Sequence, residues 1–166
     1  MKRITVIRLV MLGMLLGALT PLRAEVLKPF ILGDTPAGNA AAVAEATKTA
    51  LTKNGFEVVG SYSPYPSATI IVVTSAELKA NAAMTDLGGF GAIQRVAVTQ
   101  GKDKVQLSYT NPVYMAHAYR MKDDLKDVAA KLATALGRIE EFGAEGLTAS
   151  KLRKYHYMFG MEYFDE

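Results

Sequence analysis

Residues 96–110 read VAVTQGKDKVQLSYT, and this stretch has the clearest β-hairpin pattern of the chain. Apolar and polar residues alternate on both sides of Gly101-Lys102-Asp103, which is the spacing of two strands that each bury one face. The second strand is expected to end sharply at Asn111, because a residue that precedes proline avoids the α region. This hairpin predicts a sheet in which at least some neighbouring strands run antiparallel.

Two strands and a short helix are predicted just before the hairpin. Residues 68–74 read ATIIVVT, a β-branched run that is apolar on both faces and typical of a central, buried strand. Residues 56–62 alternate and predict a further strand. Ser75 can cap a helix that extends to about Met84, and the glycine-rich residues 86–91 are expected to form a mobile loop.

The N-terminal part of the domain predicts one strand and one long helix. Residues 26–32 form a short apolar stretch, which is a candidate first strand. An alanine-rich helix follows, with Thr35 as its expected cap and Pro36 at the first helical position, where the missing N–H costs nothing. Asn54 and Gly55 supply the stop signal of this helix.

Helices are predicted to dominate after the hairpin. Residues 113–120 predict a short helix, and a second helix starts near Asp123 and Asp124, whose charges favour the N-terminal end of the helix dipole. Gly137 stops the second helix, and a loop is expected up to Thr148. The last predicted helix carries Leu152, Tyr155, His156 and Phe159.

This order of elements predicts a single α+β domain over residues 25–166. Strands mixed with helices, including one hairpin, favour a two-layer domain in which helices pack on a mainly antiparallel or mixed sheet. The domain has 166 − 24 = 142 residues, which is enough chain to enclose a hydrophobic core.

The first 24 residues predict a cleavable secretory signal. Lys2 and Arg3 give a positive start, and residues 9–19 read LVMLGMLLGAL without a charge. This apolar run is too short to span a bilayer comfortably, and Ala24 is a small residue at the expected cleavage position. We therefore expect a periplasmic or secreted protein with no stable membrane anchoring after cleavage; an uncleaved membrane anchor is the alternative.

Removal of the signal changes the charge of the chain. The whole chain has 19 Lys and Arg against 16 Asp and Glu, and residues 1–24 hold four of the basic residues and none of the acids, which leaves 19 − 4 = 15 against 16. A mature net charge of −1 gives no electrostatic footprint for nucleic acid. The chain has no cysteine, so its stability must come from packing without disulfides.

No motif of the common enzyme classes is present. The chain has no G-x-S-x-G nucleophile elbow, no cysteine and only two histidines. The glycines of residues 88–91 match neither the dinucleotide nor the phosphate-loop pattern. The acid pairs 123–124 and 140–141 are adjacent in sequence, so they do not face each other and are expected to be solvated surface. A non-catalytic domain is therefore favoured over an enzyme of unidentified type.

Methionines and histidines make a soft-metal or haem site the alternative function. Thioether and imidazole ligands select Cu(I), and the same side chains serve as axial ligands of non-covalent haem. Ordinary packing is the competing interpretation, because methionine fills gaps in hydrophobic cores. The residues fall into two groups: Met115, His117 and Met121, and then His156, Met158 and Met161.

Residues 147–166 form an aromatic-rich C-terminal segment. Its densest part, residues 155–164, reads YHYMFGMEYF. So many apolar rings are expected to be buried, either against the same domain or against another protein. Contact with another protein is an option because aromatic residues and methionine are enriched in interface cores. The segment predicts either packing on its own domain or contact with a second copy or a periplasmic partner protein.

The stretch from about residue 40 to residue 135 resembles the family called domain of unknown function 302. The similarity is carried by residues 51–56, LTKNGF, and residues 105–115, VQLSYTNPVYM. The resemblance implies a small α+β domain that associates as a homodimer, and it implies no general enzymatic activity. Many members have cysteines that this chain lacks, so a function that uses a cysteine thiol is excluded here.

The Asn-Pro corner is the candidate ligand site. In the family a strand leads into this corner and a short helix follows, which matches Asn111 and its neighbours here. The amide of Asn111, with Tyr109 and Tyr114, is the group expected to contact a small ligand. Alternatively, an asparagine before proline terminates a strand and forms a turn with its own side chain.

Overall fold

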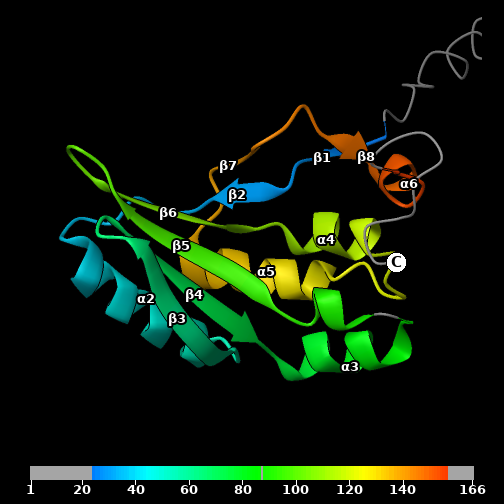
Figure 1. Cartoon of the computed structure of the whole chain (residues 1–166), viewed down its shortest axis with the longest axis horizontal. Helices are drawn as coiled ribbons and strands as arrows, with labels where there is room; N and C mark the ends of the chain where they lie inside the picture. Colours follow the sequence, from blue (N-terminus) through cyan, green and yellow to red (C-terminus); the bar gives the residue numbers. More distant parts are fainter. Residues whose placement is uncertain (1–23, 87, 157–166) are drawn as a thin grey trace, which may run out of the picture.

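The computed structural model describes residues 24–86 and 88–156, and in this part of the chain it confirms an α+β fold (Figure 1). The main sheet has six strands, all paired antiparallel. In spatial order they are β3 (Glu57–Tyr65), β4 (Ala68–Thr74), β5 (Gln94–Gln100), β6 (Val105–Thr110), β2 (Phe30–Leu32) and β7 (Glu140–Phe142). A second, two-stranded sheet pairs β1 (Val26–Leu27) with β8 (Leu147–Thr148).

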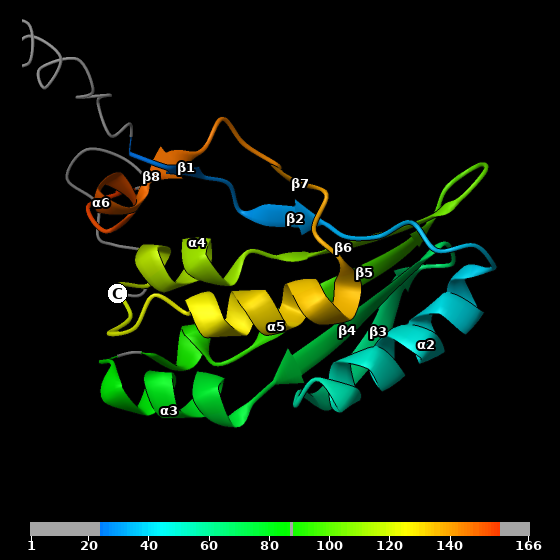
Figure 2. The same cartoon turned by 180° about the vertical axis from the view of Figure 1, so that it is seen from behind.

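The helices form the second layer, and Figure 2 shows α2 and α5 side by side on one face of the main sheet. The helical elements are α2 (Ala40–Lys53), α3 (Ala76–Met84), the 3-10 turn η1 (Gly88–Gly91), α4 (Pro112–Ala118), α5 (Lys126–Leu136) and α6 (Ala149–Leu152). Residues of both layers that face each other are buried, and Ile71, Val96 and Leu132 have no exposed surface. The core therefore lies between the sheet and the α2–α5 layer.

The predicted hairpin is present as β5 and β6. Val98 lies opposite Leu107 and Val96 opposite Tyr109, and all four side chains point into the core. The predicted strand at residues 68–74 is β4, whose Ile71 is paired with Val96, but only its helix-facing side is buried, since Ile70 and Val72 on the other face are partly exposed. Local alternation and turn chemistry were sufficient to place these strands, because each has one face against the helices.

The predicted start of the first long helix was wrong. The helix begins at Ala40, and its cap is Asn39, whose side-chain oxygen accepts a hydrogen bond from the Ala42 N–H at 2.9 Å. Gly38 has a φ of 122°, a conformation that favours glycine, and it turns the chain just before the cap. Thr35 and Pro36 therefore belong to the connection between β2 and α2.

The predicted first strand, residues 26–32, is divided in two. β1 pairs with β8, whereas β2 pairs with β6 and β7. The break falls at Lys28 and Pro29, where the carbonyl of Lys28 accepts a hydrogen bond from the Asn111 side chain at 2.9 Å. Proline has no N–H for a ladder, so a strand is easily interrupted there.

The C-terminal region also differs from the prediction. The expected loop before Thr148 contains β7, and Glu141 in this strand is half-buried instead of solvated, since its carboxylate accepts a hydrogen bond from the Lys28 N–H at 2.8 Å. The last helix ends at Leu152, so Tyr155 and His156 follow it, and Phe159 lies outside the described residues. Non-local pairing formed β7, which explains why a local pattern did not reveal it.

Residues 86–91, which were expected to form a mobile loop, include the ordered turn η1. A Cβ added to Gly91 would come within 2.1 Å of the Met121 sulfur, so this turn packs directly on the core. Phe90 stacks on Tyr119 with ring centroids 5.9 Å apart. Among the described residues, no helix is long and apolar enough to cross a membrane.

Candidate functional site

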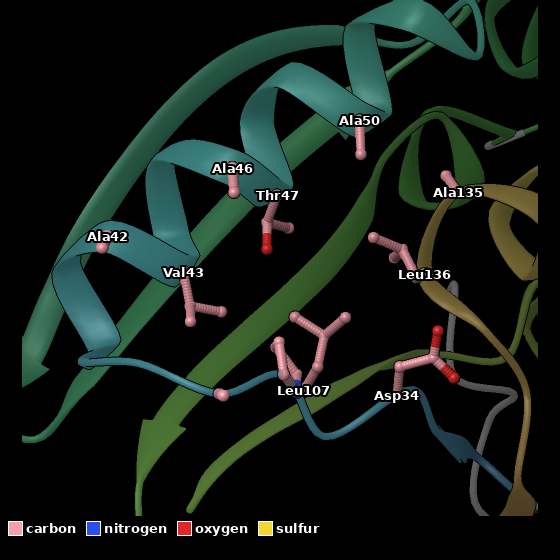
Figure 3. Close-up of a pocket in the computed structure, with 11 residues that line it drawn as sticks. Asp34, Ala42, Val43, Ala46, Thr47, Ala50, Leu107, Ala135 and Leu136 are labelled. Carbon is pink, nitrogen blue, oxygen red and sulfur yellow. The ribbon is translucent and has the colours of Figure 1, made fainter.

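A cleft of about 390 Å³ opens between α2, α5 and the connection from β2 to α2 (Figure 3). Its floor is Leu107 of β6, and its far wall is formed by Ala135 and Leu136 at the end of α5. The remaining lining residues are Asp34, Pro36, Ala37, Ala42, Val43, Ala46, Thr47 and Ala50.

The cleft exists because one face of α2 has small side chains. Ala42, Ala46 and Ala50 recur every four residues and therefore lie on the same side of the helix. A methyl group at each of these positions leaves space that leucine or phenylalanine would fill. The wall of the cleft is consequently apolar and has a regular shape.

Thr47 provides a hydroxyl group inside this apolar wall. The residue is only 5% exposed, and Figure 3 shows its oxygen directed into the cleft. Thr49 and Thr52 on the same helix donate to the carbonyl four residues before them at 3.1 and 3.0 Å, but the Thr47 hydroxyl has no hydrogen-bond partner among the described residues. Its hydrogen-bonding capacity is therefore available to an occupant of the cleft.

Asp34 provides the charged group of the cleft. Its N–H donates to the Leu136 carbonyl at 2.8 Å, and the N–H of Gly33 donates to the Leu107 carbonyl at 2.9 Å. The carboxylate packs against Gly137, where an added Cβ would come within 2.1 Å of a carboxylate oxygen. These contacts fix the backbone of Asp34 beside the end of α5, while its side chain remains exposed.

Tyr109 and Asn111, two of the predicted ligand residues, are engaged within the protein. The Tyr109 hydroxyl donates to the Gly137 carbonyl at 2.8 Å, and burial, opposed by Arg138 and assisted by Asp34, raises its pKa to about 12. The Asn111 side-chain oxygen accepts from the Val113 N–H at 3.2 Å and caps α4. Both side chains are about 1% exposed, so the turn-forming alternative describes Asn111 correctly.

Tyr114, the third predicted ligand residue, lies on α4 and does not line the cleft. Its side chain is half-buried, and burial together with the nearby Tyr155 raises the pKa of its hydroxyl. The structure therefore does not bring the three predicted ligand residues into one open site.

The first predicted metal group is not arranged around a shared centre. Met115 and His117 are two residues apart on α4, a spacing that directs side chains to different faces. Met121 is fully buried beneath Gly91, and its carbonyl accepts a hydrogen bond from Arg153 at 2.8 Å. The packing interpretation accounts for Met121.

His117 accepts a hydrogen bond at Nδ1 from Nε of Arg153 at 3.0 Å. Burial lowers the pKa of His117, and the positive charge of Arg153 lowers it further. A neutral imidazole is required here, since a protonated ring has no acceptor for the guanidinium. This contact connects α4 to the segment after α6.

The second predicted metal group lies at the end of the described chain. His156 is exposed and follows α6, whereas Met158 and Met161 lie outside the described residues. Within residues 24–86 and 88–156, no cluster of three or more His, Asp or Glu side chains is placed to hold a metal ion.

The cleft was missed by sequence reasoning, although one signal for it was present. The alanines at positions 42, 46 and 50 marked a small-residue face of a helix. That pattern alone is equally compatible with close helix packing. Only the approach of the connection at Asp34 and of the end of α5 turns this face into a cleft.

Comparison with known proteins identifies the fold. No protein-family model matches the chain, and no curated protein matches it either. A solved structure of the uncharacterized conserved protein DUF302 from Bacillus stearothermophilus matches with a TM-score of 0.56 and 17% sequence identity. The match covers 64% of this chain and 94% of that chain. The resemblance expected from the sequence is thus accompanied by a shared fold, and at this identity the likeness shows the fold alone.

Proposed function

We propose that this protein is an exported, non-catalytic domain that binds a small, largely apolar molecule in the cleft between α2 and α5. The observation that carries this proposal is the cleft itself, because an apolar wall with one accessible, unpaired hydroxyl and one carboxylate is the composition of a small-molecule site. Its volume of about 390 Å³ is within the usual range of about 300–1,000 Å³ for such sites.

The chemistry of the cleft supports binding over catalysis. Asp34 is the sole ionisable residue among those that line it. General acid–base or nucleophilic chemistry requires a second group within reach of the first, such as a histidine beside a hydroxyl. The lining residues supply none, so the cleft is suited to holding a molecule without changing it.

Copper or haem binding, the alternative function, has less support. The buried position of Met121 and the engagement of His117 Nδ1 by Arg153 leave those side chains occupied by the fold. Metal content and the absorption spectrum of protein isolated from its native cell envelope test this alternative, and stoichiometric copper or a Soret band that is lost in His117→Ala would favour it.

Export is proposed from the signal-like residues 1–24. Intact mass measurement of the protein from the periplasmic fraction is expected to give a chain that begins at Glu25, since cleavage is expected after Ala24. A chain that retains residue 1 and sediments with membranes would instead support the anchor alternative.

Self-association is proposed because the sheet face opposite the helices has a mostly apolar row of side chains. The row crosses the sheet through Tyr62, Ile70, Ala97, Ser108 and Leu32, and Ser108 is its one polar member. Tyr62 is 54% exposed on the edge strand β3. Exposed apolar surface of this kind is found at contacts between subunits.

Light scattering measures the mass in solution. The mature chain is expected to be a dimer that Tyr62→Lys dissociates, whereas Met84→Lys, which changes an equally exposed residue on α3, should leave it intact. A monomeric mature chain would refute the dimer. Comparison of residues 25–166 with residues 25–154 then reports whether the C-terminal segment contributes to association.

Cleft binding is tested with two simple probes, 4-ethylphenol and 2-phenylethylamine, in amide NMR titrations of the mature protein. At least one probe is expected to shift the signals of residues that line the cleft. Ala46→Trp should abolish these shifts by filling the cleft, and Ala41→Trp, at an exposed alanine of the same helix, should preserve them. Unchanged binding by Ala46→Trp, or no shift with either probe, would refute the proposal.

A further inference from the structure

We infer that the occupant of the α2–α5 cleft is a compact molecule with a cationic amine at one end and a hydroxyl group at the other. This inference rests on the proposed binding function and specifies the chemical class of its ligand. It follows from the two polar groups of the cleft, Asp34 and Thr47, and from the apolar surface between them.

The charge of the cleft selects a cation. Asp34 is the sole charged residue among the lining residues, and its carboxylate has no hydrogen-bond or ion-pair partner among the residues that the structure describes. In contrast, Glu45 and Glu57 are paired with lysines at 2.8 and 3.0 Å. A carboxylate at the edge of an apolar cleft attracts an ammonium group and repels an anion.

The surroundings of Asp34 keep its carboxylate free for such a partner. The charge of Asp34 contributes to the raised pKa of Tyr109, but the Tyr109 hydroxyl donates its proton to the Gly137 carbonyl. Arg138, at the adjacent position, is paired with Glu141. Neither donor of this region is therefore bonded to Asp34.

Thr47 selects a second polar group on the ligand. The Thr47 hydroxyl is accessible from the cleft, and a group that both donates and accepts a hydrogen bond satisfies it best. A ligand hydroxyl meets this requirement. Figure 3 shows Thr47 on α2 and Asp34 on the opposite side of the cleft, so the two groups contact different ends of the occupant.

The size and lining of the cleft define the middle of the ligand. A volume of about 390 Å³ is near the lower end of the range for small-molecule sites, which favours a compact body such as one aromatic ring. Val43, Leu107 and Leu136 surround this space and provide apolar contacts for it. Phenolic amines have this combination of groups.

The experiment compares four probes that differ in one group each. Tyramine has the amine and the hydroxyl, 2-phenylethylamine has the amine alone, 4-ethylphenol has the hydroxyl alone, and 3-(4-hydroxyphenyl)propionate replaces the amine with a carboxylate. Dissociation constants are measured by amide NMR titration of the mature protein. We expect tyramine to bind most tightly and the carboxylate most weakly.

Two substitutions separate the two ends. Asp34→Asn should weaken both amines by about 1.4- to 5-fold, the range for an exposed ion pair, and leave 4-ethylphenol unchanged. Thr47→Val should weaken the binding of tyramine and 4-ethylphenol by about 2- to 12-fold, the range for one hydrogen bond, and leave the binding of 2-phenylethylamine unchanged. Glu45→Gln and Thr49→Val, on the outer side of the same helix, are matched controls that should have no effect.

The outcomes distinguish the ligand class from the binding function. If the probes bind at the cleft but tyramine binds no tighter than the carboxylate, or if Asp34→Asn weakens 4-ethylphenol equally, the inferred class is overturned and the proposed binding function stands. If neither 4-ethylphenol nor 2-phenylethylamine shifts the cleft signals, both are overturned. Raising the salt concentration should weaken the amines alone, because screening acts on the ion pair.

Discussion

The buried hydrogen bond from Tyr109 to Gly137 has a quantifiable effect on stability. Tyr109→Phe removes the hydroxyl and leaves the Gly137 carbonyl, formerly bonded at 2.8 Å, without this donor. Loss of one such bond from a buried site costs about 1–2 kcal/mol in the free energy of unfolding at pH 7. Tyr65→Phe, at a tyrosine that is 54% exposed, is the control and should change the free energy by less than about 0.5 kcal/mol.

The same hydroxyl makes stability depend on alkaline pH. Folding raises the pKa of Tyr109 from 10.0 to about 12, so the unfolded chain loses this proton at a lower pH than the folded chain. The resulting stability is fully present below pH 10 and is lost as the pH rises through 10 toward 12. At pH 11 the populations implied by these two pKa values correspond to a loss of about 1.4 kcal/mol.

Urea unfolding, followed by circular dichroism at pH 7, 9, 10 and 11, measures both effects. Wild type is expected to be more stable than Tyr109→Phe at pH 7, and this difference should shrink by about 1.4 kcal/mol at pH 11. Lysines and other tyrosines titrate in both proteins, so they cancel in the difference. A difference that stays constant from pH 7 to pH 11 would refute the assigned burial and bonding of Tyr109.

Three further predictions concern other contacts of the core, each measured by urea unfolding. Asn111→Ala should lower the free energy of unfolding by about 2–3 kcal/mol, through loss of the α4 cap and of one buried hydrogen bond, and an unchanged value would contradict that capping role. Gly91→Ala should cost about 1–3 kcal/mol by overpacking, and this cost should be smaller when Gly91→Ala is introduced into the Met121→Ala variant, if the clash is the cause. Because folding lowers the pKa of His117, this group stabilises the folded state fully above its unfolded pKa of about 6.5, and this stabilisation is lost as the pH falls below that value. The free energy of unfolding of wild type should therefore fall relative to that of His117→Gln between pH 7.5 and 5. Parallel pH profiles of the two proteins would exclude a neutral imidazole that accepts the hydrogen bond of Arg153.

The open sheet face and the cleft lie on opposite sides of the main sheet. Tyr62 and Ile70 point away from the helices, whereas the cleft is on the helical side between α2 and α5. A dimer formed through the open face would therefore leave the cleft accessible. Self-association and small-molecule binding are compatible in one protein.

Sequence reasoning succeeded where the structure is local. The alternation in residues 96–110 and the turn at Gly101 predicted β5 and β6, and the β-branched run 68–74 predicted β4. It failed where a distant segment determines the conformation. β7 exists because it pairs with β2, and the cap of α2 shifted from Thr35 to Asn39 because Gly38 redirects the chain.

The candidate site shows the same division. The family resemblance singled out Asn111 and Tyr109 at the Asn-Pro corner, but both side chains are buried and make structural hydrogen bonds. No pattern in the sequence predicted that Asp34 and Thr47 line the same cleft. Their proximity to one cleft depends on how the β2–α2 connection crosses β6 and meets α5.

The sequence by itself determined the class of fold, because strand and helix periods and turn residues are properties of neighbouring residues in the chain. It also determined the absence of disulfides and the charge that remains once residues 1–24 are set apart. Only the tertiary structure decided which polar groups are satisfied within the protein and which face a cleft. That distinction depends on contacts between residues far apart in sequence, such as Asp34 with Gly137 and Thr47 with the space above Leu107.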